Sequence, residues 1–492
     1  MMKKKKLPVM ILCGVFLAMC MLFFTFTFFN NYIKKEGSQK ESESKETSKT
    51  GDMEKEPKMI NLSNLTTLEV ITDCTKFTPV TQDQSYNFET DMNQIRHSRI
   101  NFTDIGDMVY LSIPDGGLFD FSKDTGSVDI ACDRPDCEHD VKTAGGDCQA
   151  NLHQLDLDVC GLQYYKGDLY YTLGGTMLYK MSLNREIKYK YASLLGEKGF
   201  GTNDWLIHRG YIYFCSLNDG IYKMPVDNPS YKELVISMPE GISSDMYMKA
   251  YGSYLYFTVY NPKESSYAAA RYNTESNQIE QFVNVGENLN NIILDDNTFF
   301  NSIIDLSNIM VHDEKLYYIE GDGYNSKSII YQYDIMSGKN EVFLEGEDKD
   351  TNFGLIYSDS DYIYIWKNIR EGEDYYSGKE DKSISSYFAY TWDGELVEEI
   401  LNTNEMDYSR EPLEIVHRKY QTLVGSDSNR IYYLSMEWDQ QTEEDGRSYN
   451  EIEGSKKVII SYINKTELSS EAPVLEHIAG EIPVQKGVGW WM

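Results

Sequence analysis

The sequence has few basic residues for its length. Its 46 lysines and arginines are outnumbered by 78 aspartates and glutamates, which gives a net charge of −32 at pH 7. A surface that binds nucleic acid or anionic lipid needs clustered Lys and Arg to neutralise phosphates. The charge balance therefore excludes a nucleic-acid-binding role and favours solubility of the folded part.

The sequence also lacks the motifs of the common catalytic classes. It contains no His-Glu-x-x-His pair, no phosphate-binding Gly-x-x-x-x-Gly-Lys-Ser/Thr loop and no Gly-x-Ser-x-Gly elbow. These motifs mark metallopeptidases, nucleotide hydrolases and α/β-hydrolases respectively. We therefore predict no catalytic residue and no organic cofactor, and we expect a protein that is not an enzyme.

Cysteine is scarce, with 8 residues in 492, but three cysteines and one histidine form a spaced group. Cys132, Cys137, His139 and Cys148 follow the pattern C-x4-C-x-H-x8-C, and Pro135 favours a tight turn inside the first gap. Three thiolates and one imidazole are the donor set of a closed, structural zinc site. A disulfide between two of the three cysteines is the alternative, because thiols oxidise outside the cytoplasm, and unpaired thiols are a third.

Charge is absent from residues 7–29, a run that is long enough to cross a hydrocarbon layer of about 30 Å as a helix. Four lysines precede this run, so the positive-inside rule places residues 1–6 in the cytoplasm and the rest of the chain outside the cell. Residues 30–58 are rich in Lys, Glu, Ser and Thr and predict a flexible linker. We expect a cell membrane protein with a single-pass signal anchor and an extracytoplasmic domain over residues 59–492.

Tyrosine is abundant, with 39 residues against 20 phenylalanines, which favours strands. Residues 210–225 read as an aromatic and β-branched run, an Asn-Asp-Gly turn and a second such run, which is a hairpin signal. The same two-part phrase occurs in seven places along the chain: residues 108–121, 168–181, 210–225, 254–273, 315–334, 362–391 and 430–463.

These hairpins predict an all-β fold, a β-propeller. Their spacing of roughly 40 to 70 residues brackets the period of about 40 to 50 residues that is typical of propeller blades. Runs such as residues 212–214 and 316–319 have no polar face, which indicates sheets that are buried on both sides. We predict seven blades, with six or eight as alternatives, and we expect residues 65–71 to add a strand to the last blade and close the ring.

The repeated Leu/Ile-Tyr-Tyr/Phe strand, with the Leu/Ile-Tyr-Lys/Gln/Arg strand that follows it, resembles uncharacterised bacterial membrane-anchored or secreted β-propeller proteins. It is distantly similar to the YWTD-type propellers of lipoprotein receptors. The resemblance covers roughly residues 100–465 and concerns architecture. The chain lacks the YWTD tetrapeptide itself, so no receptor-like ligand is implied.

Because propellers gather loops from every blade at one face, we expect a binding module for an extracellular glycan, peptide or partner protein. The alternative is a polysaccharide-active lyase or glycosidase on the same scaffold. A cluster of His, Arg, Tyr and carboxylates at the mouth of the ring would favour the enzyme. Trp490 and Trp491, near the end of the chain, either dock on the rim of the ring or meet a partner.

Overall fold

Each predicted aromatic hairpin is present in the computed structural model, where it forms the second and third strands of an antiparallel sheet. Seven such sheets form a seven-bladed β-propeller, as predicted. The structure describes residues 58–59, 101–113, 117–139, 148–152, 159–185, 188–196, 204–216, 219–237, 248–261, 266–284, 304–320, 328–347, 351–371, 382–403, 415–442, 449–452, 455, 457–468 and 477–483.

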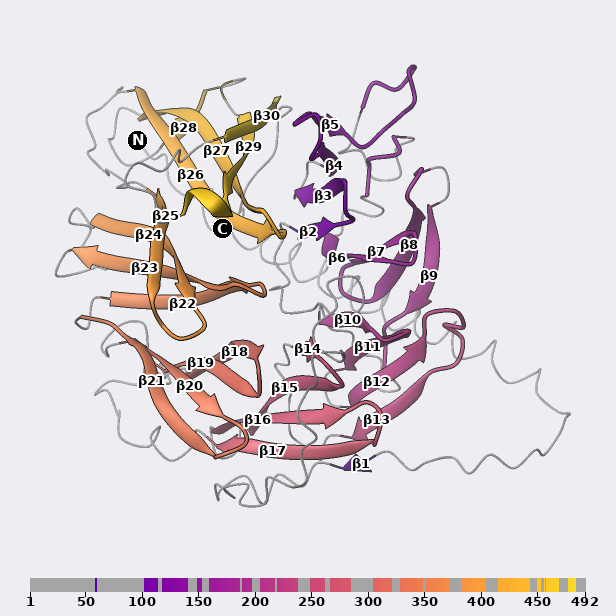
Figure 1. Ribbon diagram of the computed structural model, residues 1–492. Coiled ribbons are helices and arrows are strands. Elements are labelled where there is room, and N and C mark those ends of the chain that lie inside the picture. The colour runs from indigo at the N-terminus through magenta and orange to yellow at the C-terminus, as the bar shows by residue number, and fades with distance from the viewer. Residues whose placement is uncertain are drawn as a thin grey trace, which may run out of the picture. The chain divides into compact units, whose positions relative to one another are not determined.

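The blades follow one another in chain order (Figure 1). Blade 1 consists of β2 (Asn101–Asp104), β3 (Met108–Ile113), β4 (Gly117–Ser122) and β5 (Val128–Ile130), and blade 2 of β6 (Val159–Tyr165), β7 (Asp168–Leu173), β8 (Met177–Ser182) and β9 (Lys188–Ser193). Blade 3 consists of β10 (Trp205–His208), β11 (Tyr211–Ser216), β12 (Gly220–Pro225) and β13 (Glu233–Ser237), and β1 (Lys58–Met59) pairs in parallel with β13. Blades 4 and 5 consist of β14 (Lys249–Tyr251), β15 (Tyr254–Asn261), β16 (Ser266–Asn273) and β17 (Gln278–Asn284); and β18 (Ile304–His312), β19 (Lys315–Glu320), β20 (Ile329–Asp334) and β21 (Lys339–Glu345).

Blades 6 and 7 contain the longest strands of the described chain. They consist of β22 (Thr351–Ser358), β23 (Tyr362–Glu371), β24 (Lys382–Thr391) and β25 (Leu396–Thr403); and β26 (Ile415–Ser426), β27 (Arg430–Thr442), β29 (Lys457–Asn464) and β30 (His477–Pro483), with β28 (Tyr449–Glu451) paired to β27. A 3-10 turn, η5 (Lys465–Glu467), follows β29.

The core is divided among the seams between neighbouring blades. Seven hydrophobic clusters exist, and each combines side chains from two consecutive blades. This arrangement buries both faces of every sheet, which explains why the strands show no polar face.

One tyrosine position recurs in every blade. The third residue of the second strand is a tyrosine throughout, and none of the seven is more than 4% exposed. A buried tyrosine ring covers a large apolar area while its hydroxyl reaches a polar partner. The seven residues are Tyr110, Tyr170, Tyr213, Tyr256, Tyr317, Tyr364 and Tyr432.

Polar side chains on the first strands join neighbouring blades. The Asn101 Oδ1 atom accepts a 2.7 Å hydrogen bond from the backbone N–H of Gly161, and Gln163 Oε1 accepts one of 2.9 Å from the N–H of Ile207. Asp204 accepts similarly from the N–H of Met248. These bonds join blades 1 to 4 to one another at or just before their first strands.

The ring closes between blades 7 and 1. Strands β2 and β26 are in contact, and a cluster that includes Phe102, Phe121, Tyr432 and Ile460 fills the seam. Lys123 also forms a 2.9 Å ion pair with Asp427 across it. Figure 1 shows the indigo and yellow blades side by side.

Several predictions fall on parts of the chain that lie outside the described residues. These are the membrane span at 7–29, the linker at 30–58 apart from its last residue, the closing strand at 65–71, and Trp490 and Trp491. Lys58, the last residue of the predicted linker, lies in β1. The five described strands of blade 7, β26 to β30, come from residues 415–483. Among the described residues, no helix has the length and hydrophobicity needed to span a membrane.

Candidate functional site

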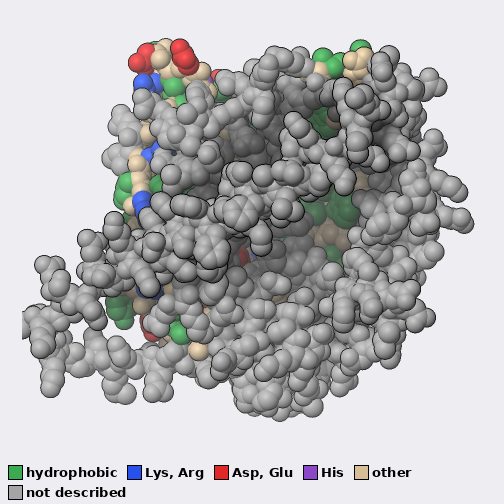
Figure 2. Space-filling model, turned by 180° about the vertical axis from the view of Figure 1, so that it is seen from behind, with side chains coloured by type: hydrophobic (Ala, Val, Ile, Leu, Met, Phe, Trp, Pro, Cys, Tyr) green, Lys and Arg blue, Asp and Glu red, His purple; other side chains and the backbone are tan. Residues whose placement is uncertain are grey.

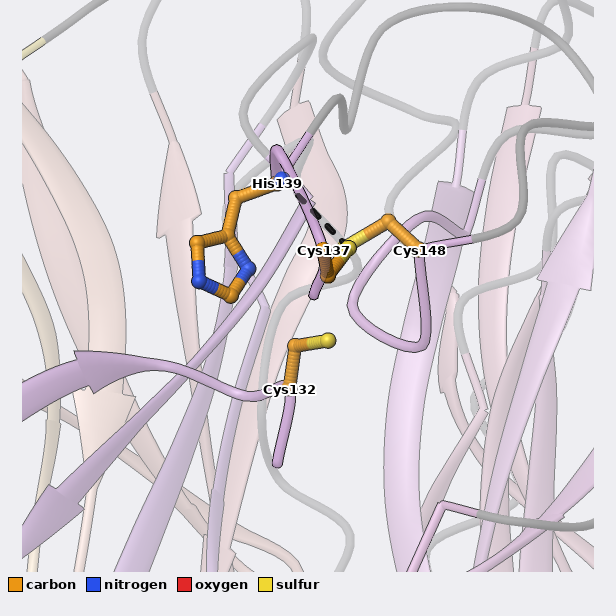
Figure 3. A group of neighbouring side chains, drawn as sticks. All are labelled: Cys132, Cys137, His139 and Cys148. Carbon is orange, nitrogen blue, oxygen red and sulfur yellow. Dashed lines mark hydrogen bonds between the residues drawn. The ribbon is translucent and has the colours of Figure 1, made fainter. Parts of the chain in front are cut away.

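The four residues of the C-x4-C-x-H-x8-C pattern meet in the connection between blades 1 and 2. The three Sγ atoms and one imidazole nitrogen of Cys132, Cys137, His139 and Cys148 all lie within 4.8 Å of one another. Figure 3 shows their side chains facing the same small space. No disulfide joins any of the five described cysteines, which include all three of this group.

Local backbone geometry brings these side chains together. Cys132 comes two residues after β5, and a turn closed by the 3.2 Å bond from the Cys137 N–H to the Arg134 carbonyl returns the chain toward it. His139 has a positive φ of 54°, which is unusual for a residue with a side chain. Its backbone N–H donates to Cys137 Sγ at 3.4 Å, and its Nδ1 atom is buried without a hydrogen-bond partner.

The cysteine group has two halves, residues 132–139 and the segment around Cys148, and the backbone of Leu118 in β4 binds next to both. The Ala131 N–H, just before Cys132, donates to the Leu118 carbonyl at 3.0 Å, and the Leu118 N–H donates to the Ala150 carbonyl at 2.8 Å. Both halves are therefore fixed to the same strand of blade 1.

Four polar side chains that carry no recognisable sequence signal support the group: Gln149, Arg185, Asp133 and Asp120. Gln149 Oε1 accepts a 2.9 Å hydrogen bond from the N–H of Asp133, which bridges the two halves directly. Arg185, which follows β8 of blade 2, is paired at 2.5 Å with both Asp133 and Asp120. Arg185 is 9% exposed. Since Arg185 belongs to blade 2 and Asp120 to blade 1, these two ion pairs connect the cysteine group to both blades.

The two thiols at the ends of the group differ in acidity. Burial opposes ionisation of Cys132, but hydrogen bonds from the backbone of Arg134 and Gln149 and from the other two thiols lower its pKa to about 7. Burial raises the pKa of Cys148 to about 12.

The two histidines that precede second strands are packed within the fold. His208 is fully buried, and burial lowers its pKa to about 3, so it is neutral at physiological pH. His312 stacks on Trp392 with ring centroids 4.2 Å apart, and burial lowers its pKa also. His208 is therefore closed off from solvent, whereas His312 is partly exposed beside Trp392.

The two ends of the ring differ in how they connect the strands. At one end, which we call the turn face, only two or three residues separate the first and second strands of each blade. At the opposite end, the loop face, the strands are joined by longer segments such as residues 131–158, 285–303 and 372–381. The cysteine group follows the end of β5 and therefore lies at the loop face.

Blade 7 extends farthest at the loop face. Strands β26 and β27 have 12 and 13 residues, whereas β2 and β10 have 4 each. Since all of these hairpins begin from similar short turns at the turn face, the extra residues lie toward the loop face. The exposed Ile415 and a 2.9 Å pair between His417 Nδ1 and Asp439 Oδ1 mark this extension, which we call the blade 7 extension.

Figure 2 shows the molecule from behind, with the side chains coloured by type. Along one edge, Lys and Arg side chains alternate with hydrophobic groups of the described residues. Exposed tyrosines of blades 2 and 3, Tyr189, Tyr211 and Tyr231, are among the large hydrophobic residues that remain accessible to solvent.

Comparisons with known proteins give distant structural matches and no family. No protein family matches the chain, and no curated protein matches its sequence. Among solved structures, a study of two prolyl endopeptidases gives a match at 9% identity with a TM-score of 0.40, covering 77% of this chain and 55% of that one. The computationally designed Ika8 protein matches at 10% identity with a TM-score of 0.36, covering 76% and 95%.

The oligogalacturonate lyase from Vibrio parahaemolyticus is a third structural match. Its identity is 7% and its TM-score 0.33, with 60% of this chain and 83% of that chain covered. These neighbours are distant β-propeller proteins. The seven-bladed propeller of this chain is shown by its own seven sheets. The expected similarity to YWTD-type propellers is not confirmed by these matches.

Proposed function

We propose that this chain is a membrane-anchored, extracytoplasmic binding module that recognises a glycan, peptide or partner protein at the loop face. Residues 7–29 would anchor it as a single-pass protein with its N-terminus inside the cell. The observation that carries the proposal is an asymmetry of the ring: two or three residues join the first and second strands at the turn face, whereas the connections between consecutive blades, such as residues 131–158 and 285–303, lie at the loop face.

The rest of the described molecule supports binding over catalysis. The buried titratable groups are used to join strands and blades: Asp204 accepts from the next blade, and His208 is enclosed. A binding surface needs exposed groups on a rigid scaffold, and the blade 7 extension offers these in a hairpin that is paired along its whole length.

Two exposed hydrophobic residues make a matched test of the loop face. Ile415 is 61% exposed at the start of β26 on the loop face, and Leu396 is 56% exposed at the start of β25 on the turn face. Ile415→Asp and Leu396→Asp add the same charge at similar exposure. If the ligand meets the blade 7 extension, only Ile415→Asp weakens binding, by about tenfold, the effect typical of a moderate interface residue.

The experiment uses the full chain in lipid nanodiscs with purified cell-wall glycans, capsular polysaccharides and cell-surface proteins as separate probes. Saturable binding that Ile415→Asp weakens and Leu396→Asp leaves unchanged supports the proposal. Equal weakening by both variants, or no saturable binding to any probe, overturns it. Release of shortened or unsaturated glycan products would instead establish the lyase or glycosidase alternative.

A further inference from the structure

We propose that Cys132, Cys137, His139 and Cys148 bind one zinc ion and that this ion locks the connection between blades 1 and 2 onto both blades. The inference goes beyond the proposed binding function, because it concerns how the loop face is held in shape.

The donor geometry fits a tetrahedral ion. With Zn–S and Zn–N distances of about 2.3 and 2.0 Å, ligand atoms of a tetrahedral site lie about 3.5 to 3.8 Å apart. The four donor atoms lie within 4.8 Å of one another, so a contraction of about 1 Å completes the site. On binding, Zn²⁺ replaces the thiol protons, which are released to solvent, and no electron is transferred.

A metal accounts for all four residues, whereas a disulfide does not. A disulfide would join two of the three sulfurs and leave the third thiol and the imidazole unused. The His139 Nδ1 atom is buried and has no hydrogen-bond partner, and a buried nitrogen of this kind normally has one. Metal ligation by the imidazole explains why this side chain is turned inward on a residue with a positive φ of 54°.

The surroundings are arranged in advance around the four donors. Gln149 joins the two halves through the Asp133 N–H, Leu118 holds the backbone beside each half, and Arg185 ties Asp133 to blade 2. Such partners of the ligand-bearing segments orient the ligands, and their loss typically lowers metal affinity by 10- to 100-fold.

The position of the site explains its structural role. Cys148 belongs to the hydrophobic cluster that fills the seam between blades 1 and 2, and Cys132 and Cys137 pack against that cluster. With four protein ligands, the ion would have no open position for water or substrate, so the site stabilises and does not catalyse.

Metal content of the purified full chain tests the proposal. We expect inductively coupled plasma mass spectrometry to find about one zinc ion per native chain and none in the Cys132→Ala and His139→Ala variants. Cys160→Ala is the matched control, because Cys160 is a partly exposed cysteine outside the group, and it should retain the ion. Replacement by Co²⁺ should give the visible absorption of a tetrahedral thiolate site, which reports on the native chain even where a variant fails to fold.

Two further measurements separate the alternatives. Gln149→Ala keeps all four donors and should lower zinc affinity by 10- to 100-fold in a chelator competition. Chelation should lower the melting temperature of the native chain by several degrees and leave that of Cys132→Ala unchanged. The proposal is overturned if the native chain contains no metal and its cysteines of this group are alkylated only after reduction, which would show a disulfide. Zinc retained in both ligand variants also overturns it.

Discussion

A single tyrosine position connects the sequence repeat to the stability of each blade. In blades 6 and 7 the hydroxyl of this tyrosine donates to the aspartate that opens the same hairpin: Tyr364 to Asp359 at 2.6 Å and Tyr432 to Asp427 at 2.7 Å. The same aspartates accept from backbone N–H groups of the turn, such as those of Tyr362 and Arg430. One residue pair therefore fixes both the turn and the ring that packs in the seam.

Removing one hydroxyl should reveal this role. We predict that Tyr432→Phe lowers the free energy of unfolding by about 1.5 to 3 kcal/mol, the usual contribution of a hydrogen bond to a charged group. Tyr171→Phe is the control, since Tyr171 is equally buried but its hydroxyl has no hydrogen-bond partner. That variant should be neutral or slightly more stable, because it removes an unsatisfied polar group.

Urea denaturation of the full chain in detergent, followed by near-UV circular dichroism, measures both variants. The interpretation is wrong if Tyr171→Phe is destabilised as much as Tyr432→Phe, because the ring and its packing would then be responsible for the loss.

At the scale of single residues, the sequence allowed the donors of the candidate metal site to be predicted but not their supporters. The Cys and His residues carry a recognisable spacing. Gln149 and Arg185 carry none, and Arg185 reaches the site only because blade 2 packs against blade 1. Such contacts depend on tertiary structure, so no local sequence pattern predicts them.

At the scale of elements, the second and third strands were predictable and the first strands were not. The former repeat an aromatic phrase with a turn, whereas first strands such as Lys249–Tyr251 and Val159–Tyr165 share no composition. They face the axis and are held by specific contacts with the neighbouring first strand, for example through Gln163. Their sequences therefore vary with those contacts and show no common period.

The closing seam between blades 7 and 1 shows how tight these elements are. A Cβ atom on Gly425 of β26 would lie 2.5 Å from Cδ1 of Phe102 on β2. Contact this close forces the ring or a strand to move. We infer that glycine at this position permits β26 to approach β2 closely enough to close the ring.

Gly425→Ala should therefore destabilise the chain, by about 1 to 3 kcal/mol, the usual cost of overpacking. Phe102→Ala removes the Cγ, Cδ1 and Cε1 atoms that would clash, so adding it to Gly425→Ala should recover part of the loss. A double-mutant cycle by urea denaturation measures this coupling. Strictly additive effects of the two changes would show that the seam does not depend on this contact.

At the scale of the whole molecule, the repeat predicted a ring, and the structure adds its closure and its two unlike faces. The closure was expected from residues 65–71, which lie outside the described residues, so that prediction stays a prediction; the strands described in blade 7 come from residues 415–483. The unlike faces follow from the strand order, which the sequence could indicate only after the first strands were known.

Net charge acts on this ring as a whole. A charge of −32 repels itself, and compact folding increases that repulsion. Salt reduces the range of the repulsion, from about 30 Å at 0.01 M to about 8 Å at 0.15 M. Buried pairs are screened much less, and Arg271 and Glu314, 2.6 Å apart with side chains 0% and 13% exposed, are such a pair.

The melting temperature of the full chain should therefore rise by several degrees when NaCl is increased from 0.01 to about 0.15 M. Differential scanning fluorimetry in detergent measures the change, and repeating the series with KCl excludes a specific effect of sodium. A melting temperature that falls over this range would mean that partly exposed ion pairs, such as Lys457 with Glu437 at 3.3 Å on blade 7, contribute more to stability than the net repulsion removes. In that case, the acidic composition would serve solubility at no cost to the folded ring.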